Sequence, residues 1–225
     1  MFFKGLLIVF LIISVKSLQI DVLVESLCPD CMGFISQSFA EFVKAENHHL
    51  LANVTFYPYG NAHQSFDGSR WNFVCQHGPN ECYGNLIETC VVRQFTPEFS
   101  HNFLICLEAN ILSYGKDFKA ASNFCLANQP QTVVDTIWGC VESDVGNRFQ
   151  HEVADFTDNV NPPHKYVPWV IVDGSHDPKV EDAILNDMLG YLCQQSKLNI
   201  PACETRSEFL NSFFEEKALS KCYRD

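Results

Sequence analysis

The sequence predicts an α/β fold, a central mixed sheet flanked by helices, with a cysteine-rich helical insertion in its middle. A β-rich segment, residues 19–26, runs directly into helical spacing after Cys28, which is typical of a strand followed by a helix. Two later segments, 53–57 and 169–172, also have the composition of strands. Residues 184–192 then follow with the spacing of an amphipathic helix.

The first strand and the first helix meet at Cys28. Residues 19–26 are largely apolar, which indicates a strand that is buried on at least one face. After Pro29, apolar residues recur at helical spacing between residues 35 and 43. Pro29 suits the first turn of a helix because its missing N–H would have no intrahelical partner there. We therefore place Cys28 between the end of a strand and the start of a helix.

The second strand is stopped by Pro58, and the region from residue 63 to about 150 follows. This region holds six of the eleven cysteines, and its spacing is helical more than strand-like, so we expect a helical insertion. Asn53-Val54-Thr55 is the only acceptor triplet for N-glycosylation, and we predict a glycan on Asn53.

The last part of the domain begins with a proline-rich approach. Residues 161–168 are non-helical and lead into the buried strand 169–172. Asp173-Gly174 then predicts a short hairpin. The helix over residues 184–192 completes the order strand, helix, strand, helical insertion, strand, hairpin, helix.

The N-terminus predicts a secretory signal peptide over residues 1–17. Lys4 supplies a positive charge, and Leu6–Ile13 is an unbroken apolar run that covers less than half of the ~20 residues of a membrane-spanning helix. We expect one domain over residues 18–200 and a C-terminal tail over 201–225, whose removal on maturation the sequence leaves open.

Composition excludes several classes of protein. A net charge of −12 argues against nucleic-acid binding, which requires clustered Lys and Arg. A hydrophobic content of 47% with 19 Phe indicates a packed globule, so the eleven cysteines are not the staples of a loop-rich miniprotein. No second long apolar run occurs, so we expect no membrane span once the signal peptide is cleaved.

The run Cys28-Pro29-Asp30-Cys31 carries the predicted chemistry. A Cys-x-x-Cys at a strand-to-helix junction resembles the thioredoxin fold. A helix N-terminus lowers the pKa of a thiol, and the thiolate is the form that attacks disulfides. We therefore assign Cys28 as the nucleophile and Cys31 as the resolving thiol. A zinc site would require a second closely spaced cysteine pair, so we expect no metal. A permanent structural disulfide is the other alternative, and the position at a helix start argues against it.

The two residues between the cysteines tune the pair. The carboxylate of Asp30 should oppose ionisation of the nearby thiol and so favour the disulfide form, which makes the enzyme a better reductant. Pro29 belongs to the same tuning segment. A raised thiol pKa would also slow attack in an acidic compartment, and the sequence does not decide how the two effects balance.

Pro168 is the second element of the predicted site. Val167-Pro168 resembles the step that is cis in thioredoxin-like proteins and presents its backbone to the substrate peptide. An ordinary trans proline at a strand start is the alternative, because only ~5–6% of X–Pro bonds in folded proteins are cis. The context favours cis, with Val167 and Pro168 as substrate-binding residues.

A more specific pattern lies in the insertion. The chain resembles, at every fixed position, the signature of the gamma-interferon-inducible lysosomal thiol reductase (GILT) family. The fixed positions are Cys75, Gln76, His77, Gly78, Glu81, Cys82, Asn85 and Cys90. Segments 58–62 and 163–169 also look like family segments, so the resemblance covers about residues 20–195.

The resemblance implies a thioredoxin-like domain with a helical insertion, reduction of protein disulfides, and activity in acidic endosomes or lysosomes or after secretion. The signature cysteines are expected to form structural disulfides, and His77, Glu81 and Asn85 to hold their loop together. Two features depart from the family pattern. The first strand leaves no room for an N-terminal propeptide, and the tail with Cys203 and Cys222 lies outside the resemblance. Nine cysteines remain outside the active pair, an odd number whose connectivity the sequence does not give.

The predicted function is reduction of disulfides in partly unfolded protein substrates by a monomeric or weakly associated enzyme. It needs no metal or organic cofactor, and a small-molecule thiol regenerates it. One alternative is an oxidase or isomerase of oxidative folding, which a reduction potential well above that of glutathione would indicate. The other is a secreted binding protein with the same fold and purely structural thiols. The sequence does not identify the substrates, the pH optimum, the oligomeric state or the final location, lysosomal or extracellular.

Overall fold

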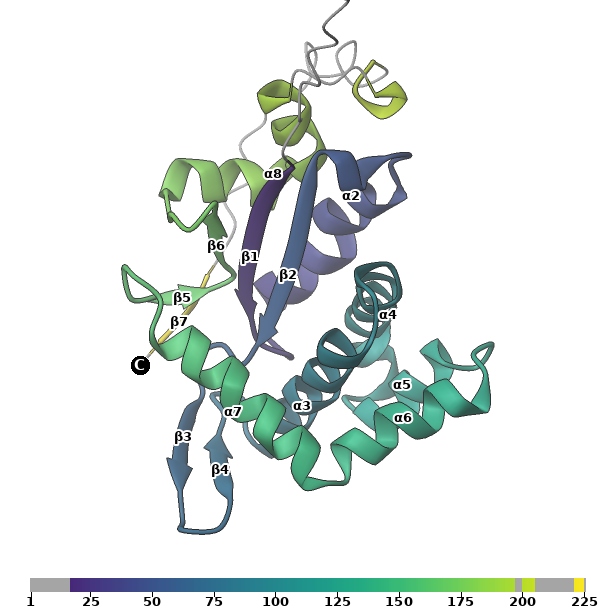
Figure 1. Cartoon of the computed structure of the whole chain (residues 1–225), viewed down its shortest axis with the longest axis vertical. Coiled ribbons are helices and arrows are strands. Elements are labelled where there is room, and N and C mark those ends of the chain that lie inside the picture. Colours follow the sequence, from purple (N-terminus) through teal and green to yellow (C-terminus); the bar gives the residue numbers. More distant parts are fainter. Residues whose placement is uncertain (1–16, 197–199, 205–220, 225) are drawn as a thin grey trace, which may run out of the picture.

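The computed structural model describes residues 17–196, 200–204 and 221–224. Of the predicted signal peptide, residues 1–16 lie outside the described residues, as does most of the predicted tail. A three-stranded sheet with its helices forms one part of the molecule, and a group of helices with a two-stranded hairpin forms the other (Figure 1). This is a mixed α/β structure.

The central sheet has the strand order β2-β1-β6. Its strands are β1 (Leu18–Val24), β2 (Ala52–Pro58) and β6 (Trp169–Val172). β1 pairs parallel with β2 and antiparallel with β6, so the sheet is mixed, as predicted. The side chains of Ile20, Val22 and Leu23 are fully buried, which explains the near-continuous apolar run of this strand.

Three consecutive helical segments follow β1 and confirm the predicted first helix. They are α1 (Pro29–Phe34), the π-helical turn η1 (Ile35–Phe39) and α2 (Ala40–Lys44), with a 3-10 turn η2 (His48–Leu50) before β2. Phe39 packs its ring against Phe56 of β2 at 4.8 Å between centroids and against His101 at 5.0 Å. The helical face and the sheet thus share one aromatic core.

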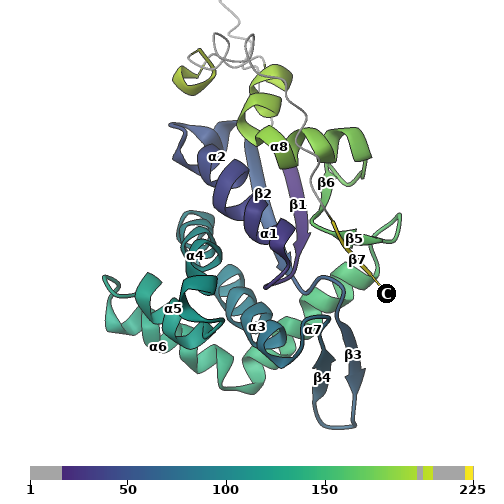
Figure 2. The same cartoon turned by 180° about the vertical axis from the view of Figure 1, so that it is seen from behind.

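The last helix, α8 (Pro178–Gln195), lies on the same side of the sheet as α1 and α2 (Figure 2). Ser38 of the π-helical turn binds it at a kink: its Oγ donates to the Ile184 carbonyl at 2.9 Å and accepts from the Met188 N–H at 2.9 Å. The backbone between them departs from helical geometry at Asp187. One hydroxyl therefore holds two helices together and satisfies a backbone group that the kink releases.

The insertion begins differently from the prediction. Two strands, β3 (His63–Phe66) and β4 (Trp71–Val74), form a hairpin before the first helix of the insertion. Their residues are mostly exposed or half-exposed, so neither strand has the buried alternation that a sequence pattern reveals.

The remainder of the insertion is helical, as predicted, and continues to residue 158. Its segments are α3 (Pro79–Gln94), α4 (Pro97–Asn110), η3 (Ile111–Tyr114), α5 (Phe118–Cys125), α6 (Gln131–Val141) and α7 (Asp144–Asp158). Disulfides join Cys90 to Cys140 and Cys106 to Cys125, tying α3 to α6 and α4 to α5. Each crosslink restrains the unfolded chain and so stabilises the helical group.

The C-terminal third confirms the predicted strand, short hairpin and helix. β5 (Tyr166–Val167) precedes β6, and Asp173-Gly174 does turn the chain, both with positive φ. After the turn only the single bridge Val172–Ser175 forms, and the chain proceeds to α8. No helix among the described residues is long and apolar enough to cross a membrane.

Candidate active site

Cys28 occupies the N-cap of α1, directly after the loop that leaves β1, as the sequence predicts. Leu27 before it has a φ of 68°, a left-handed conformation that turns the chain sharply from strand to helix. The Cys28 side chain is fully buried, and its Sγ lies 3.9 Å from the carbonyl oxygen of Val167. The Val167–Pro168 peptide bond is cis, as predicted. The predicted nucleophile and the predicted substrate-binding residues therefore meet.

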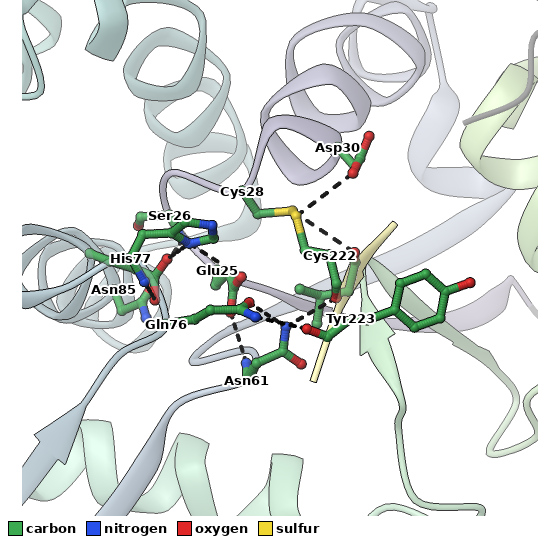
Figure 3. The surroundings of a disulfide bond; sticks show 12 residues. Glu25, Ser26, Cys28, Asp30, Asn61, Gln76, His77, Asn85, Cys222 and Tyr223 are labelled. Carbon is green, nitrogen blue, oxygen red and sulfur yellow. Dashed lines mark hydrogen bonds and ion pairs between the residues drawn. A yellow bond between two sulfur atoms is a disulfide. The ribbon is translucent and has the colours of Figure 1, made fainter. Parts of the chain in front are cut away.

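Cys28 is bonded to Cys222, and Cys31 is a free, buried thiol. Cys222 belongs to the short strand β7 (Cys222–Tyr223), which pairs antiparallel with β5. Figure 3 shows the disulfide beside the N-terminus of α1, and Oδ2 of Asp30 lies 3.7 Å from the Cys222 sulfur. Cys222, in the tail that lies outside the family resemblance, therefore reaches the predicted active cysteine.

The described disulfides account for the odd cysteine number. Eight of the nine cysteines outside the predicted active pair form four disulfides, and the ninth is Cys222. The four disulfides join Cys75–Cys82, Cys90–Cys140, Cys106–Cys125 and Cys193–Cys203. The signature cysteines are therefore structural, as expected.

Cys31 lies in an environment that keeps its thiol protonated. Burial raises the pKa of Cys31 well above its usual range, and the nearby carboxyl of Glu25 raises it further, against a backbone hydrogen bond with Glu25 that lowers it. The carboxyls of Glu108 and Glu88 add to the rise. A thiol of this kind is a poor nucleophile until a base takes its proton. This environment allows a disulfide on Cys28 to persist beside a free Cys31.

Glu25 is the functional residue that the sequence analysis missed. Its side chain is buried between the end of β1 and the signature loop, where Oε2 accepts a hydrogen bond from the Asn61 N–H at 2.8 Å. Burial raises the pKa of Glu25 to about 8, with a further contribution from Glu81. Nδ1 of His77 lies 3.6 Å from its Oε1. A carboxyl that changes charge near neutral pH beside Cys31 is suited to exchange a proton with that thiol.

One signal in the sequence could have revealed Glu25. It continues a strand of buried apolar residues and directly precedes the Ser26-Leu27-Cys28 turn, so the strand's direction carries a carboxylate inward. A buried acid needs a specific environment because desolvation disfavours its charged form. Here Gly60 supplies the space, since a Cβ at that position would collide with the Glu25 side chain.

The signature residues of the insertion support the loop that holds Cys28. Oδ1 of Asn85 accepts a hydrogen bond from the Ser26 N–H at 2.8 Å, and Ser26 donates its hydroxyl to Glu88 at 3.2 Å. His77 contacts Glu81 directly, and burial raises the pKa of that carboxyl. Gly78, with a φ of 88°, turns the chain into α3, where a side chain would be strained. These contacts agree with the expected structural role.

Gln76 reaches beyond the signature loop. Its Nε2 donates to the Tyr223 carbonyl at 2.8 Å, and its Oε1 accepts from Asn61 Nδ2 at 3.0 Å (Figure 3). The same Asn61 Nδ2 donates to the Cys222 carbonyl at 3.0 Å. Asn61, after β2, and Gln76, in the insertion, therefore contribute two amides that hold the segment bonded to Cys28.

Comparison with known proteins agrees with this site. A protein-family profile described as gamma interferon inducible lysosomal thiol reductase (GILT) matches residues 19–129. The gamma-interferon-inducible lysosomal thiol reductase of Carassius auratus is 36% identical over 180 residues, which cover 79% of this chain and 68% of that protein. This chain belongs to the GILT family. The protein of the same name in Mus musculus is 30% identical over 78% of this chain and 66% of its own length. GILT-like protein 1 of Drosophila melanogaster is 28% identical over 80% and 76%.

Family membership confirms the resemblance predicted from the signature. It also supports the predicted class of enzyme, a thiol reductase, that is, an oxidoreductase that acts on disulfides. The roles of individual residues in this GILT family member rest on the geometry described above.

A pair of buried glutamates lies behind the site of this GILT family member. Glu88 of α3, which accepts the Ser26 hydroxyl, and Glu108 of α4 are both buried, and burial raises the pKa of both carboxyls. The nearby carboxyl of Glu88 raises the pKa of Glu108 further. The folded state therefore favours the protonated form of this pair.

Two remaining predictions concern ligands of the site and of the surface. Atoms of Glu25, His77 and Glu81 lie within 4.8 Å of one another, the spacing of a three-ligand cation site. Their mutual contacts and the Asn61 hydrogen bond to Glu25 already give them protein partners, so the arrangement fits a hydrogen-bonded cluster and the absence of a metal site stays a prediction. Asn53 lies exposed on β2, an accessible position for the predicted glycan.

Proposed function

We propose that this chain reduces disulfides in partly unfolded proteins, with Cys28 as nucleophile and Cys31 as resolving thiol. The observation that carries the proposal is the position of Cys28, which caps α1 and faces the Val167 carbonyl 3.9 Å away, with a buried thiol one helical turn further on. The strand order β2-β1-β6, with α1 directly after β1, supports a thioredoxin-like arrangement of these parts.

The reaction follows from this geometry. The Cys28 thiolate attacks one sulfur of a substrate disulfide, and the other substrate cysteine leaves as a thiolate that takes up a proton. Cys31 then gives up its proton and attacks Cys28, which releases the second substrate thiol and forms the Cys28–Cys31 disulfide. Two molecules of a small-molecule thiol restore the dithiol and leave as their own disulfide. Glu25 is placed to receive the Cys31 proton.

Location and partners complete the proposal. The relatives whose name includes "lysosomal" support an endosomal or lysosomal site of action, with secretion as the alternative. We expect extended, partly unfolded substrates, because the Cys28 side chain is fully buried and a folded surface could not reach its sulfur. No organic cofactor is required by the reaction.

A trapping experiment tests the proposed function. The variant should carry both Cys31→Ser and Cys222→Ser, because Cys222 would otherwise occupy Cys28. After mild reduction and exposure to a denatured disulfide protein at acidic and neutral pH, we expect mixed disulfides through Cys28 in non-reducing electrophoresis. The matched control, Cys28→Ser with Cys222→Ser, should form none. Absence of adducts at both pH values would instead favour a binding protein, and a potential well above that of glutathione would favour an oxidase.

Asp30→His is expected to make the cysteine pair more oxidising. The substitution removes a carboxylate that lies 3.7 Å from the Cys222 sulfur, which is bonded to Cys28, and introduces a group that can carry positive charge. This change favours the thiolate and therefore the reduced form. Each unit of lowered thiol pKa corresponds to about 30 mV. Equilibration of the Cys222→Ser background with glutathione buffers measures the potential, with Asp30→Asn as control for loss of charge alone. A more reducing Asp30→His variant would contradict the proposed role of Asp30.

A further inference from the structure

The residues around Cys222 lie against the site as an extended peptide. β7 pairs antiparallel with β5, with Tyr223 opposite Tyr166 and Cys222 opposite Val167 (Figure 1). The Arg224 N–H donates to the Lys165 carbonyl at 2.9 Å. Backbone pairing of this kind accepts any extended segment and sets its register, so it places a cysteine at the Cys28 sulfur.

Two side-chain amides add a second set of backbone contacts. Asn61 donates to the Cys222 carbonyl, and Gln76 donates to the Tyr223 carbonyl (Figure 3). Both contacts bind main-chain oxygens, so they also hold a peptide irrespective of its side chains. The segment is thereby bound by β5 and by the amides of Asn61 and Gln76.

The side chain before the cysteine enters an acidic position. Lys221 Nζ lies 2.9 Å from Oε1 of Glu181, whose side chain is fully buried, and 3.3 Å from Oδ1 of Asp182. The same ammonium donates to the Tyr166 hydroxyl at 3.1 Å and lies 4.2 Å from the centre of its ring. Glu181 is held in place by the Val170 N–H at 2.9 Å. This position is built for a cation.

The residues after the cysteine meet a second acidic position. Nη2 of Arg224 donates to Oδ1 of Asp158 at 3.2 Å. The Tyr223 ring lies edge-on to Tyr166, 5.4 Å between centroids. The segment thus carries two basic residues, and each of them faces carboxylates of the site.

We propose that residues 221–224 occupy the peptide site of the reductase as a built-in substrate, and that the site selects disulfide segments with a basic residue before the cysteine, an aromatic residue after it and a second basic residue next. The inference rests on the proposed function and adds its substrate class, cationic cysteine peptides. The same segment keeps Cys28 in a mixed disulfide, so the resting enzyme is closed until that bond is exchanged.

Opening the resting enzyme requires no new chemistry. Cys31 loses its proton and attacks the Cys28 sulfur; the Cys28–Cys31 bond forms, the Cys28–Cys222 bond breaks, and Cys222 leaves as a thiolate that takes up the proton. No electrons enter or leave the protein in this exchange. Two molecules of a small-molecule thiol then reduce Cys28–Cys31 and form one small-molecule disulfide.

Short peptides test the selection. The probe is Ala-Lys-Cys-Tyr-Arg-Ala with its cysteine bonded to thionitrobenzoate, and the matched peptide carries Glu in place of Lys and of Arg. The Cys222→Ser protein is pre-reduced, freed of reductant and mixed with each peptide at neutral pH, and the second-order rate of thionitrobenzoate release is recorded. We expect the basic peptide to react on the order of tenfold faster, because two charged contacts favour it.

Reversing the charge of two carboxylates tests which residues select the peptide. Asp158→Lys combined with Asp182→Lys should reduce the basic-to-acidic rate ratio to about one or below. Glu98→Lys combined with Glu142→Lys makes the same change of charge at two exposed positions outside the site and should keep the ratio of the parent. Both peptide rates are measured on the same variant, so a smaller fraction of folded protein lowers both rates equally and leaves their ratio unchanged. An unchanged rate ratio in the double variant would contradict the proposal that Asp158 and Asp182 select basic peptides.

The outcomes separate the inference from the proposed function. Failure of both peptides to react with pre-reduced protein would reject Cys28 as the nucleophile, whereas equal reaction of both would reject only the selection. Disulfide mapping of the full chain, purified without thiol, is expected to find Cys28 linked to Cys222 and Cys31 as a free thiol. A map with Cys28–Cys31 and a free Cys222 would overturn the closed resting state.

Discussion

Replacing Cys28 with serine is expected to abolish enzymatic reduction of protein disulfides and to leave only the rate of the small-molecule thiol itself. Serine retains the size and position of the N-cap of α1, yet a hydroxyl cannot form the mixed disulfide on which both steps depend. The measurement is release of free thiols from a denatured disulfide protein, at acidic and neutral pH, in the presence of excess cysteine. Residual activity above the thiol background would move the nucleophile elsewhere.

Because Cys28→Ser also frees Cys222, a control must separate the two effects. Cys222→Ser alone should retain activity and begin without delay, since its Cys28 carries no mixed disulfide with the tail. Cys75→Ser is the matched loss of a structural disulfide, because Cys75 bonds to Cys82 and not to the active cysteine. We expect it to weaken the signature loop while activity persists. Equal loss in Cys28→Ser and Cys75→Ser would show that the assay reports folding.

Glu108→Gln is expected to make the protein more stable at neutral pH and to flatten the dependence of its stability on pH. Burial raises the pKa of Glu108 and Glu88 in the folded state above the unfolded value near 4.5. The two carboxyls therefore contribute fully to the unfolding free energy below the unfolded pKa, and this contribution is lost as pH rises through their folded pKa. Gln has a similar size and cannot ionise, so it removes the cost of a buried charge at this position. Each unit of raised pKa is worth about 1.4 kcal/mol.

Urea unfolding at pH 5 and pH 8 with disulfides intact measures this effect. The parent should have the higher unfolding free energy at pH 5, and Glu108→Gln should narrow the difference by at least about 1 kcal/mol. The exposed Glu142, changed to Gln, is the control and should leave the difference as it is. A parent that is more stable at pH 8 would contradict the raised pKa of the pair.

Two other buried groups also make the stability of the protein depend on pH. Glu25, with its pKa raised to about 8, acts in the same direction as the pair, so its stabilisation is lost as pH rises toward 8. His101 acts in the opposite direction: burial lowers its pKa to about 4 from 6.5, and stability is lost as pH falls through that interval. The balance favours mildly acidic conditions, which agrees with the proposed endosomal or lysosomal site of action.

The parts of the fold that the sequence predicts are those with local apolar patterns. Ile20 and Val22 identify β1, and the apolar spacing after Pro29 identifies the helices that follow it. Both can be predicted because the spacing of buried apolar residues along a short segment depends on whether it is a strand or a helix. The hairpin β3–β4 was missed because its side chains alternate little in burial. Asp173-Gly174 marks the short hairpin correctly, with one bridge between Val172 and Ser175 before α8 begins at Pro178.

The candidate site divides in the same way. Cys28, its place at a helix start and the cis bond before Pro168 follow from short motifs. Cys222 could not be found, because it meets Cys28 across a sequence separation of 194 residues and through a strand of only two residues. Glu25 was read only as part of a strand, since its burial depends on the turn at Gly60 in a distant loop.

The burial of Cys90 and Cys140 protects their disulfide from the small-molecule thiol that regenerates the enzyme. Both residues are buried, while each of the other disulfides between described residues includes at least one partly exposed cysteine. Thiol-disulfide exchange requires the thiolate to approach a sulfur atom in line with the S–S bond. A small-molecule thiol is therefore expected to reduce the disulfide at Cys28 much faster than the Cys90–Cys140 disulfide between α3 and α6. The helical insertion is therefore expected to keep its shape through many catalytic cycles in a strongly reducing medium.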